Sequence, residues 1–325
     1  MSVLVVGGAG YIGSHAAHAL KRRGYEAIIY DNLCTGHVSL AQGFEFITGD
    51  ISDAARLKPV LQRVDAVMHF AAHAYVGESV LEPRKYFQNN FVAAFSLLNS
   101  ALDCKVKKFI FSSTCATYGT PRTMPITEET PQLPVNPYGA SKLAFEQALQ
   151  AYDRAYGLRS VSFRYFNAAG ADENGLVGEV HSPETHLIPS AFEAIHGERP
   201  ALEIYGNDYP TPDGTCIRDY IHVNDLAEAH VLGLGYLEHG NSTALNLGTG
   251  RGNSVNEVIA TIERVTGKEV PRRMAPRRAG DPPELVADPS RAKEILNWKA
   301  KRSLEQIVST AWNWDQSQRA GRSGH

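Results

Sequence analysis

Short apolar segments alternate with longer amphipathic segments over the first half of the chain. The apolar segments have the continuous hydrophobic pattern of buried parallel strands, and they lie at residues 3–6, 27–30, 44–48, 66–70, 109–112 and 161–165. Helical patterns occupy most of the intervals, notably residues 11–23, 83–102 and 137–156. Repeated units of strand followed by helix predict an α/β fold with a doubly wound parallel sheet.

The pattern changes after Asn167. Loops rich in Gly, Pro and Asp, at residues 172–183, 207–214 and 271–289, separate short helices. This composition suits a smaller domain that covers a ligand. We therefore expect a first domain at residues 1–165, a second at residues 166–316 with some segments returning to the first, and a flexible tail at residues 317–325.

Composition excludes several classes of function. The 32 Lys+Arg and 35 Asp+Glu residues give a net charge of −3, which offers no basic surface for nucleic acid or an anionic membrane. No apolar run approaches the roughly 20 residues of a membrane span. The four cysteines, Cys34, Cys104, Cys115 and Cys216, form no CxxC pair, which predicts free thiols in a reducing compartment. We expect a soluble cytoplasmic protein that binds no nucleic acid, membrane or metal.

Three glycines follow the first predicted strand. Gly7, Gly10 and Gly13 form a GxxGxxG turn before a helix, where a bare backbone lets a pyrophosphate approach the helix N-terminus. Asp31 ends the next strand, where its carboxylate can bind both ribose hydroxyls of NAD and would repel the 2′-phosphate of NADP. Asp50 ends the third strand and either accepts from the adenine amino group or caps a turn. The pattern predicts a Rossmann-type NAD site, with a tight turn that binds nothing as the alternative.

Tyr138 and Lys142 form the only YxxxK pattern in the chain. On a helix the two side chains share one face, and the preceding strand ends near Thr114 at the edge where doubly wound sheets bind ligands. A lysine ammonium and a nicotinamide cation would both lower the tyrosine pKa from about 10 toward neutrality, as a general base requires. The alternative is an exposed helical tyrosine and lysine.

Together these motifs resemble the extended short-chain dehydrogenase/reductase family, and within it the UDP-glucose (UDP-galactose) 4-epimerases. The resemblance extends from Val3 to about Lys299. It rests on GGAGYIGSH from Gly7, DNL from Asp31, GD from Gly49, HFAA from His69, NN from Asn89, SSTCATYG from Ser112, PYGASK from Pro137, RYFNAAGAD from Arg164, YGNDYPTPDGTCIRDYIHV from Tyr205, LGTG from Leu247 and RRAGD from Arg277.

The resemblance implies an isomerase that interconverts UDP-galactose and UDP-glucose with a tightly bound NAD. Tyr138 would remove the proton of the sugar 4-hydroxyl while C4 passes a hydride to NAD. The 4-keto sugar would rotate and take the hydride back on its other face. Lys142 would hold the nicotinamide ribose, and Thr114 would hydrogen-bond the reacting oxygen.

The resemblance also implies the binding residues by position. The cofactor residues are Gly7, Gly10, Tyr11, Ile12, Gly13, Asp31, Asn32, Asp50, Ile51, Phe70, Ala71, Ala72, Asn90, Tyr138, Lys142 and Phe166. The UDP-sugar residues are Thr114, Tyr138, Asn167, His186, Leu187, Tyr205, Arg218, Arg278, Asp281 and Leu285. Relatives dimerise through two helices per subunit, which match residues 83–102 and 137–156, so we expect a homodimer.

Departures from the family pattern leave the substrate open. Many epimerases have Lys at the position of Ala74, and Leu285 stands where hexose-restricted enzymes have Tyr and enzymes for N-acetylated sugars have a small residue. The segments AYVGES from Ala74 and MPITEETPQ from Met124 are also similar to UDP-arabinose/UDP-xylose 4-epimerases. Pentose and N-acetylhexosamine substrates therefore stay possible.

Two remoter alternatives concern the reaction itself. A sugar-nucleotide 4,6-dehydratase needs an Asp-Glu pair directly after Thr114, where this chain has Cys115 and Ala116. A non-catalytic NAD-binding protein could keep the fold. Such proteins often lose the tyrosine or the lysine, and this chain keeps both.

Overall fold

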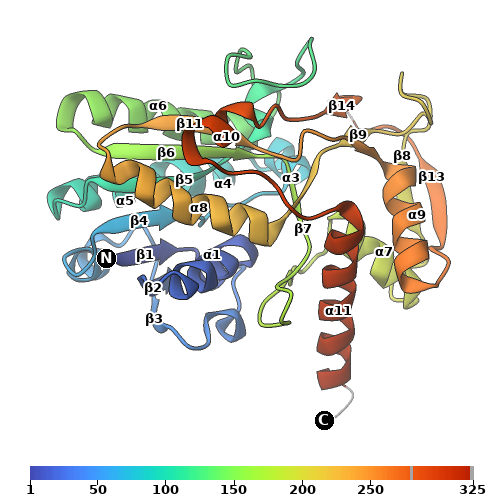
Figure 1. The fold of residues 1–325 in the computed structure, drawn as a ribbon, viewed down its shortest axis with the longest axis horizontal. Helices are drawn as coiled ribbons and strands as arrows, with labels where there is room; N and C mark the ends of the chain where they lie inside the picture. The colour runs from blue at the N-terminus through green and yellow to red at the C-terminus, as the bar shows by residue number, and fades with distance from the viewer. Residues whose placement is uncertain (279–280, 323–325) are drawn as a thin grey trace.

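A sheet of seven parallel strands forms the centre of the molecule, in the order β11-β6-β5-β4-β1-β2-β3 (Figure 1). The computed structural model describes residues 1–278 and 281–322. The strands of this sheet are β1 (Ser2–Val6), β2 (Glu26–Asp31), β3 (Glu45–Thr48), β4 (Ala66–His69), β5 (Lys108–Thr114), β6 (Arg159–Tyr165) and β11 (Thr243–Leu247). The predicted doubly wound α/β fold is confirmed.

Helices cover both faces of this sheet. They are α1 (Tyr11–Arg22), η1 (Val38–Ala41), α2 (Ala54–Leu61), α3 (Val76–Leu81), α4 (Pro83–Phe87), η2 (Gln88–Ala93), α5 (Ala94–Asp103), η3 (Cys115–Tyr118), α6 (Pro137–Tyr156), α8 (Val223–Glu238) and α10 (Ser290–Leu296). The predicted helix over residues 83–102 is divided, because η2 is a π-helical turn between α4 and α5.

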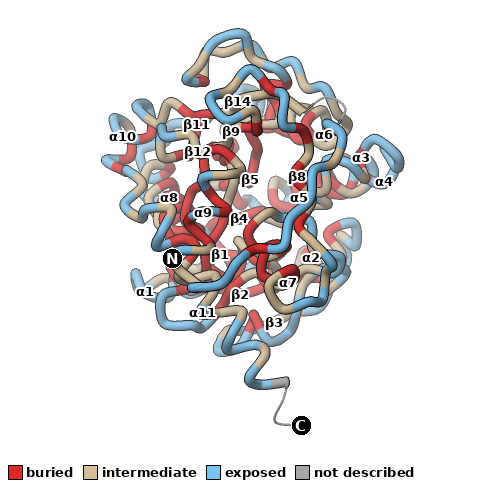
Figure 2. Tube along the Cα trace, turned by 90° about the vertical axis from the view of Figure 1, so that its right-hand side faces the viewer, coloured by how far each residue is buried: buried red, intermediate tan, exposed pale blue. Residues whose placement is uncertain are grey.

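Strand β1 shows why two helical layers are needed. Val3 and Val5 pack in the apolar cluster that includes α1 and α8, whereas Leu4 and Val6 pack in the cluster that includes α2, α5 and α6. Successive side chains of a strand point to opposite faces, so a strand that is apolar throughout must be covered on both. Figure 2 shows the central strands as buried and the outer turns of the helices as exposed.

A smaller lobe lies beyond the carboxyl ends of the strands. Its elements are β7 (Asn167–Ala169), α7 (Leu187–Ile195), β8 (Leu202–Tyr205), β9 (Ile217–Arg218), β10 (Tyr220–His222), β12 (Asn253–Ser254), α9 (Val255–Thr266), β13 (Arg272–Ala275), β14 (Glu284–Leu285) and α11 (Leu304–Arg322). A separate apolar cluster joins α7, α9 and α11, and includes Phe192, Ile259 and Ile307. The chain after residue 166 contributes to both lobes. Strand β11 pairs with β6 and helix α8 packs against α1, so both belong to the larger lobe that is built on the seven-stranded sheet.

The structure differs from two sequence expectations in this lobe. Strands β13 and β14 lie in the predicted loop of residues 271–289, where they pair with β8 and β9. Residues 317–322, predicted as a flexible tail, continue helix α11, and Arg319 forms an ion pair with Glu198. Residues 323–325 of that predicted tail lie outside the described residues.

A buried ion pair connects β6 to α6 beneath the carboxyl edge of the sheet. Arg164 lies 2.7 Å from Glu146, and the two side chains are 4% and 2% exposed. Arg164 also donates to the Tyr118 hydroxyl at 2.9 Å, and Glu146 accepts from the Ser113 hydroxyl. The pair therefore ties together the elements that carry the predicted catalytic residues.

We expect Arg164→Met to lower the free energy of unfolding by about 3–5 kcal/mol, because it leaves the carboxylate of Glu146 buried without its countercharge. The matched control is Arg159→Met on the same strand. The Arg159 side chain is 41% exposed, and it pairs with Asp153. Arg159→Met should lower the free energy of unfolding by about 1 kcal/mol or less. Denaturant unfolding measures both, and equal losses for the two variants would contradict this account.

Candidate active site

The three predicted catalytic residues meet at the carboxyl end of β5. Thr114 is the last residue of β5, and Tyr138 and Lys142 lie one turn apart near the start of α6. Asn136 caps this helix by accepting the Gly139 N–H at 2.9 Å, and Pro137 occupies its first turn. The Tyr138 hydroxyl hydrogen-bonds Thr114. The capped helix start thus fixes the tyrosine over the strand end.

Lys142 is anchored below the tyrosine. Its ammonium donates to the Ser112 carbonyl oxygen at 2.8 Å and lies 4.9 Å from the centre of the Phe111 ring. Burial lowers the pKa of Lys142 to about 7, against the opposing effect of Glu146. The lysine is therefore positioned by β5 and close to its titration point at neutral pH.

In the protein alone, burial acts on the pKa of Tyr138 in the direction opposite to the predicted lowering. Burial raises this pKa to about 12, although the hydrogen bond to Thr114 acts in the opposite direction. The predicted lowering includes the charge of the nicotinamide, so it stays a prediction for the enzyme with NAD bound, where that charge must offset the cost of burying a phenolate. Without a further positive charge, Tyr138 keeps its proton at neutral pH.

Tyr86 is a residue of this site that the sequence analysis missed. Its ring meets the Tyr138 ring edge-on, with centroids 6.4 Å apart, and its hydroxyl is bonded to the Tyr75 carbonyl oxygen and to Glu78. Tyr86 is completely buried and belongs to no motif. It forms a fixed wall beside the tyrosine.

The glycine turn after β1 can hold a dinucleotide. A Cβ on Gly7 would lie 2.4 Å from the Ala71 nitrogen, and a Cβ on Gly13 would lie 2.2 Å from the Gly7 oxygen. Gly10 caps α1 without a side chain, so the first N–H groups of this helix face the turn. The turn therefore brings bare backbone and a helix N-terminus together, which suits a pyrophosphate.

Asp31 connects this turn to the end of β2. One of its carboxylate oxygens accepts the Ala9 N–H at 3.0 Å and the other accepts the Leu33 N–H at 2.8 Å. Each oxygen retains a lone pair that can accept a ribose hydroxyl. Burial raises the pKa of Asp31, and these two backbone hydrogen bonds oppose the rise. The residues present thus fit an adenosine with free ribose hydroxyls.

Other predicted cofactor residues already hold neighbouring segments. Asn32 donates to Asp50 at 2.7 Å, and Asn90 makes hydrogen bonds with both the N–H and the carbonyl oxygen of His73, each at 2.9 Å. The remaining ones either begin α1 or directly follow strands β3, β4 and β6, and they are Tyr11, Ile12, Ile51, Phe70, Ala71, Ala72 and Phe166. The structure therefore places the predicted cofactor residues along one edge of the sheet.

The predicted substrate arginines lie in the smaller lobe, and each has a partner. Arg218 forms an ion pair with Asp281, and the Arg278 guanidinium lies 3.8 Å from the centre of the Tyr205 ring. Leu285 pairs with Arg218 in the small sheet of β14 and β9. Positions 279 and 280 of the RRAGD motif lie outside the described residues.

Three further predicted substrate residues follow the domain junction. Asn167 begins β7, and its N–H donates to the Asp219 carbonyl oxygen at 2.9 Å. His186 and Leu187 begin α7, and the His186 imidazole contacts Glu179. Although burial opposes it, Glu179 raises the pKa of His186 to about 9.

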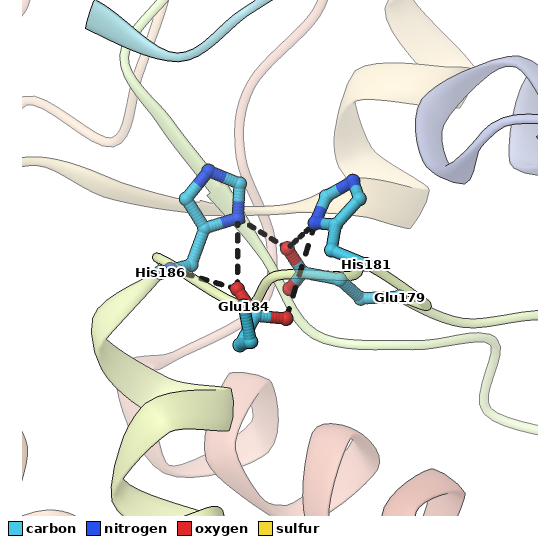
Figure 3. A group of neighbouring side chains, drawn as sticks. All are labelled: Glu179, His181, Glu184 and His186. Carbon is cyan, nitrogen blue, oxygen red and sulfur yellow. Dashed lines mark hydrogen bonds and ion pairs between the residues drawn. The ribbon is translucent and has the colours of Figure 1, made fainter. Parts of the chain in front are cut away.

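His186 belongs to a group of four side chains that the sequence analysis did not identify. The other members are Glu179, His181 and Glu184 (Figure 3). Two histidines and two glutamates within eight consecutive residues were the available signal.

Among the helices of the described residues, none is long and apolar enough to cross a membrane.

Comparison with known proteins identifies the family. The NAD dependent epimerase/dehydratase family matches residues 3–248. A UDP-glucose 4-epimerase of Halalkalibacterium halodurans is 49% identical over 99% of this chain and 98% of its own length. The chain belongs to the NAD dependent epimerase/dehydratase family.

Solved structures agree with this assignment. The UDP-glucose 4-epimerase of Brucella ovis in complex with NAD is 52% identical, with a TM-score of 0.93 over 96% of this chain and 98% of that chain. The UDP-glucose-4-epimerase of Stenotrophomonas maltophila, with bound NAD and formylated UDP-arabinopyranose, is 40% identical, with a TM-score of 0.95 over 99% of both chains. The predicted family and fold are confirmed.

We expect Gly7→Ala to reduce the dinucleotide that copurifies with the protein by at least about tenfold. The backbone at Gly7 has a φ of +78° and a Cβ there would overlap Ala71, so the turn would have to shift. The control is Gly77→Ala, because no atom lies within 4 Å of a Cβ at Gly77. The dinucleotide released on denaturation is measured by chromatography, and full retention in Gly7→Ala would contradict the proposed cradle.

Proposed function

We propose that the protein catalyses the NAD-dependent 4-epimerisation of UDP-hexoses, interconverting UDP-galactose and UDP-glucose. The observation that carries this proposal is the hydrogen-bonded pair Tyr138 and Thr114 above the buried Lys142, at the edge of the sheet that also holds the glycine turn. The UDP-glucose 4-epimerases reported above support it, one with NAD and one with NAD and a UDP-sugar.

Tyr138 acts as the base for the sugar 4-hydroxyl. When bound, oxidised NAD supplies a hydride acceptor for C4 and a positive charge near the phenol. Because burial alone raises the pKa of Tyr138 to about 12, its activity as a base is confined to the loaded enzyme. Thr114 bonds the same phenol oxygen and can pass the proton between it and the substrate.

The arginines of the smaller lobe bind the diphosphate. Arg218 is held against Asp281 and Arg278 lies over Tyr205, so both guanidinium groups have a defined position before substrate enters. A diphosphate can take bidentate hydrogen bonds from these groups, and Asp281 can accept from ribose hydroxyls.

The dehydratase alternative lacks its acid. Cys115 follows Thr114, and burial raises the pKa of its thiol to about 12, so it neither donates nor accepts a proton readily at neutral pH. Ala116 has no ionisable group. A protein that only bound NAD would not need Tyr138, Lys142 and Thr114 to lie together.

Purified protein without added NAD should convert UDP-galactose to UDP-glucose, and Tyr138→Phe should reduce this rate at least about a thousandfold, because a phenyl ring cannot take the proton. Tyr236→Phe, on helix α8 and outside both the site and the proposed dimer face, should leave the rate unchanged. Products are resolved by chromatography, and NAD content is measured for each variant.

Parallel assays with UDP-N-acetylgalactosamine and UDP-arabinose test the range of substrates. Leu285 packs beside Cys115 and Phe166, so its side chain is placed to limit the sugar pocket. Conversion of none of the three sugars by NAD-loaded protein, or substantial activity of Tyr138→Phe, would contradict the proposed reaction.

We also propose a homodimer formed through α4, η2, α5 and α6. Three large apolar side chains on these helices are solvent-exposed, Phe87 at 40%, Val92 at 49% and Tyr156 at 52%. The same helices pack against one another within the subunit, which gives a continuous face. A second copy would remove this apolar surface from water.

We expect Val92→Asp to convert the dimer to a monomer at micromolar concentrations, because it places a charge in the apolar face. Val38→Asp is the control, since Val38 is 56% exposed and lies on η1. Light scattering after size-exclusion chromatography gives the mass of each. A monomeric wild-type protein, or an unchanged Val92→Asp dimer, would contradict this interface.

A cytoplasmic location is part of the proposal. All four cysteines are free, and the thiol of Cys34 is exposed. Free exposed thiols are typical of a reducing compartment.

A further inference from the structure

Four potential metal ligands converge in the loop that precedes α7. Glu179, His181, Glu184 and His186 each place one ligand atom within 4.8 Å of the others. Figure 3 shows both imidazole rings turned toward the two carboxylates. The carboxylate side chains are 9% and 6% exposed, whereas the His186 side chain is 46% exposed, so the convergence point is shielded on the carboxylate side and open at His186.

The separations between the ligand atoms are close to those of a tetrahedral metal site. His181 Nδ1 lies 2.9 Å from Glu179 Oε1 and 3.9 Å from Glu184 Oε2. Metal–ligand bonds of about 2.0–2.1 Å in a tetrahedral zinc site place neighbouring ligand atoms about 3.3 Å apart. The four ligand atoms all lie within 4.8 Å of one another, so shifts of up to about 1.5 Å would bring them to that spacing.

The hydrogen bonding of the loop leaves one ligand atom without a partner, whereas the ligand atoms of His186 and Glu179 bond each other. His181 Nδ1 is buried and, within residues 1–278 and 281–322, has no hydrogen-bond partner of good geometry, although two carboxylates face it. Buried polar atoms normally have a partner, so this nitrogen requires an explanation. Glu184 Oε1 accepts the N–H groups of Thr185 and His186, each at 2.7 Å, which directs its other oxygen toward His181. Such support of ligands by backbone groups is typical of metal sites.

The donor set selects the class of ion. Two imidazole nitrogens and two carboxylate oxygens suit Zn²⁺, whereas Mg²⁺ and Ca²⁺ prefer oxygen ligands alone. Binding would displace the proton that Glu179 holds on His186, and one divalent ion with two neutral imidazoles would then balance the two carboxylate charges. We propose that Glu179, His181, Glu184 and His186 bind one zinc ion in a structural site.

The position of this zinc site gives it a structural role. The His181 ring meets the rings of Tyr11 and Tyr75 edge-on, with centroids 6.4 and 6.1 Å apart, and both tyrosines belong to the larger lobe. The Trp314 indole N–H on α11 donates to the Glu179 carbonyl oxygen at 3.0 Å. An ion here would fix the loop between the cofactor turn and the smaller lobe without taking part in proton or hydride transfer.

The test is direct metal binding by the purified protein after treatment with a chelator. Calorimetric titration with Zn²⁺ should give one ion per chain, and Co²⁺ should give the strong visible absorption of a tetrahedral site. Both His181→Gln and Glu184→Gln should weaken binding by at least about a hundredfold and abolish this absorption. His239→Ala, an exposed histidine after α8, should bind like the wild type.

The retained dinucleotide and the circular dichroism spectrum show whether each variant is folded. If one ligand variant fails to fold, the other variant and the wild-type stoichiometry still decide. Absence of stoichiometric binding by the wild type would overturn the proposal. Binding that persists in folded His181→Gln or Glu184→Gln would also overturn it, because the ion would then lie elsewhere, for example at the exposed thiol of Cys34.

Discussion

Coverage of both faces of the central sheet is the constraint on which the rest of this structure depends. Strand β1 is apolar on both sides, and the helices that bury it leave ligands only the ends of the strands. Because the strands are parallel, their carboxyl ends form one edge, which collects the glycine turn, Asp31 and Thr114 from sequence positions far apart. The smaller lobe, which carries Arg218 and Arg278, lies beyond that edge. The site is thus a consequence of the sheet and its two helical layers.

The same burial shifts the pKa values of the predicted catalytic residues. It raises the pKa of Tyr138 to about 12 and lowers that of Lys142 to about 7, so each group is held in its neutral form more than it would be in water. Glu146 acts on Lys142 in the opposite direction and is itself paired with Arg164. The ion pair in the core and Lys142 are therefore coupled electrostatically.

Local signals explain what could be predicted from the sequence. The helix over residues 137–156 has the predicted bounds, because Pro137 begins it and Gly157 ends it in the left-handed conformation with φ of 66°. The glycine turn and the Tyr138–Lys142 pair could likewise be predicted, because each lies within a short segment of sequence. The π-helical turn η2 could not be predicted, since Asn90 bonds His73 on a loop distant in sequence. The raised pKa of Tyr138 and the convergence of Glu179 and His186 depend on tertiary burial in the same way.

Tyr11 shows how the two lobes can be coupled through few atoms. It begins α1 at the cofactor turn, and its hydroxyl donates to the Gly170 carbonyl oxygen in the smaller lobe at 2.6 Å. Burial, together with Glu179 and Glu184, raises its pKa well above the usual value, so the phenol stays neutral and keeps this donor. Arg22 at the end of the same helix lies 3.5 Å from Asp172, which adds a second polar contact across the junction. Because α1 carries both contacts, a shift of the glycine turn would also move the segment of Gly170 and Asp172.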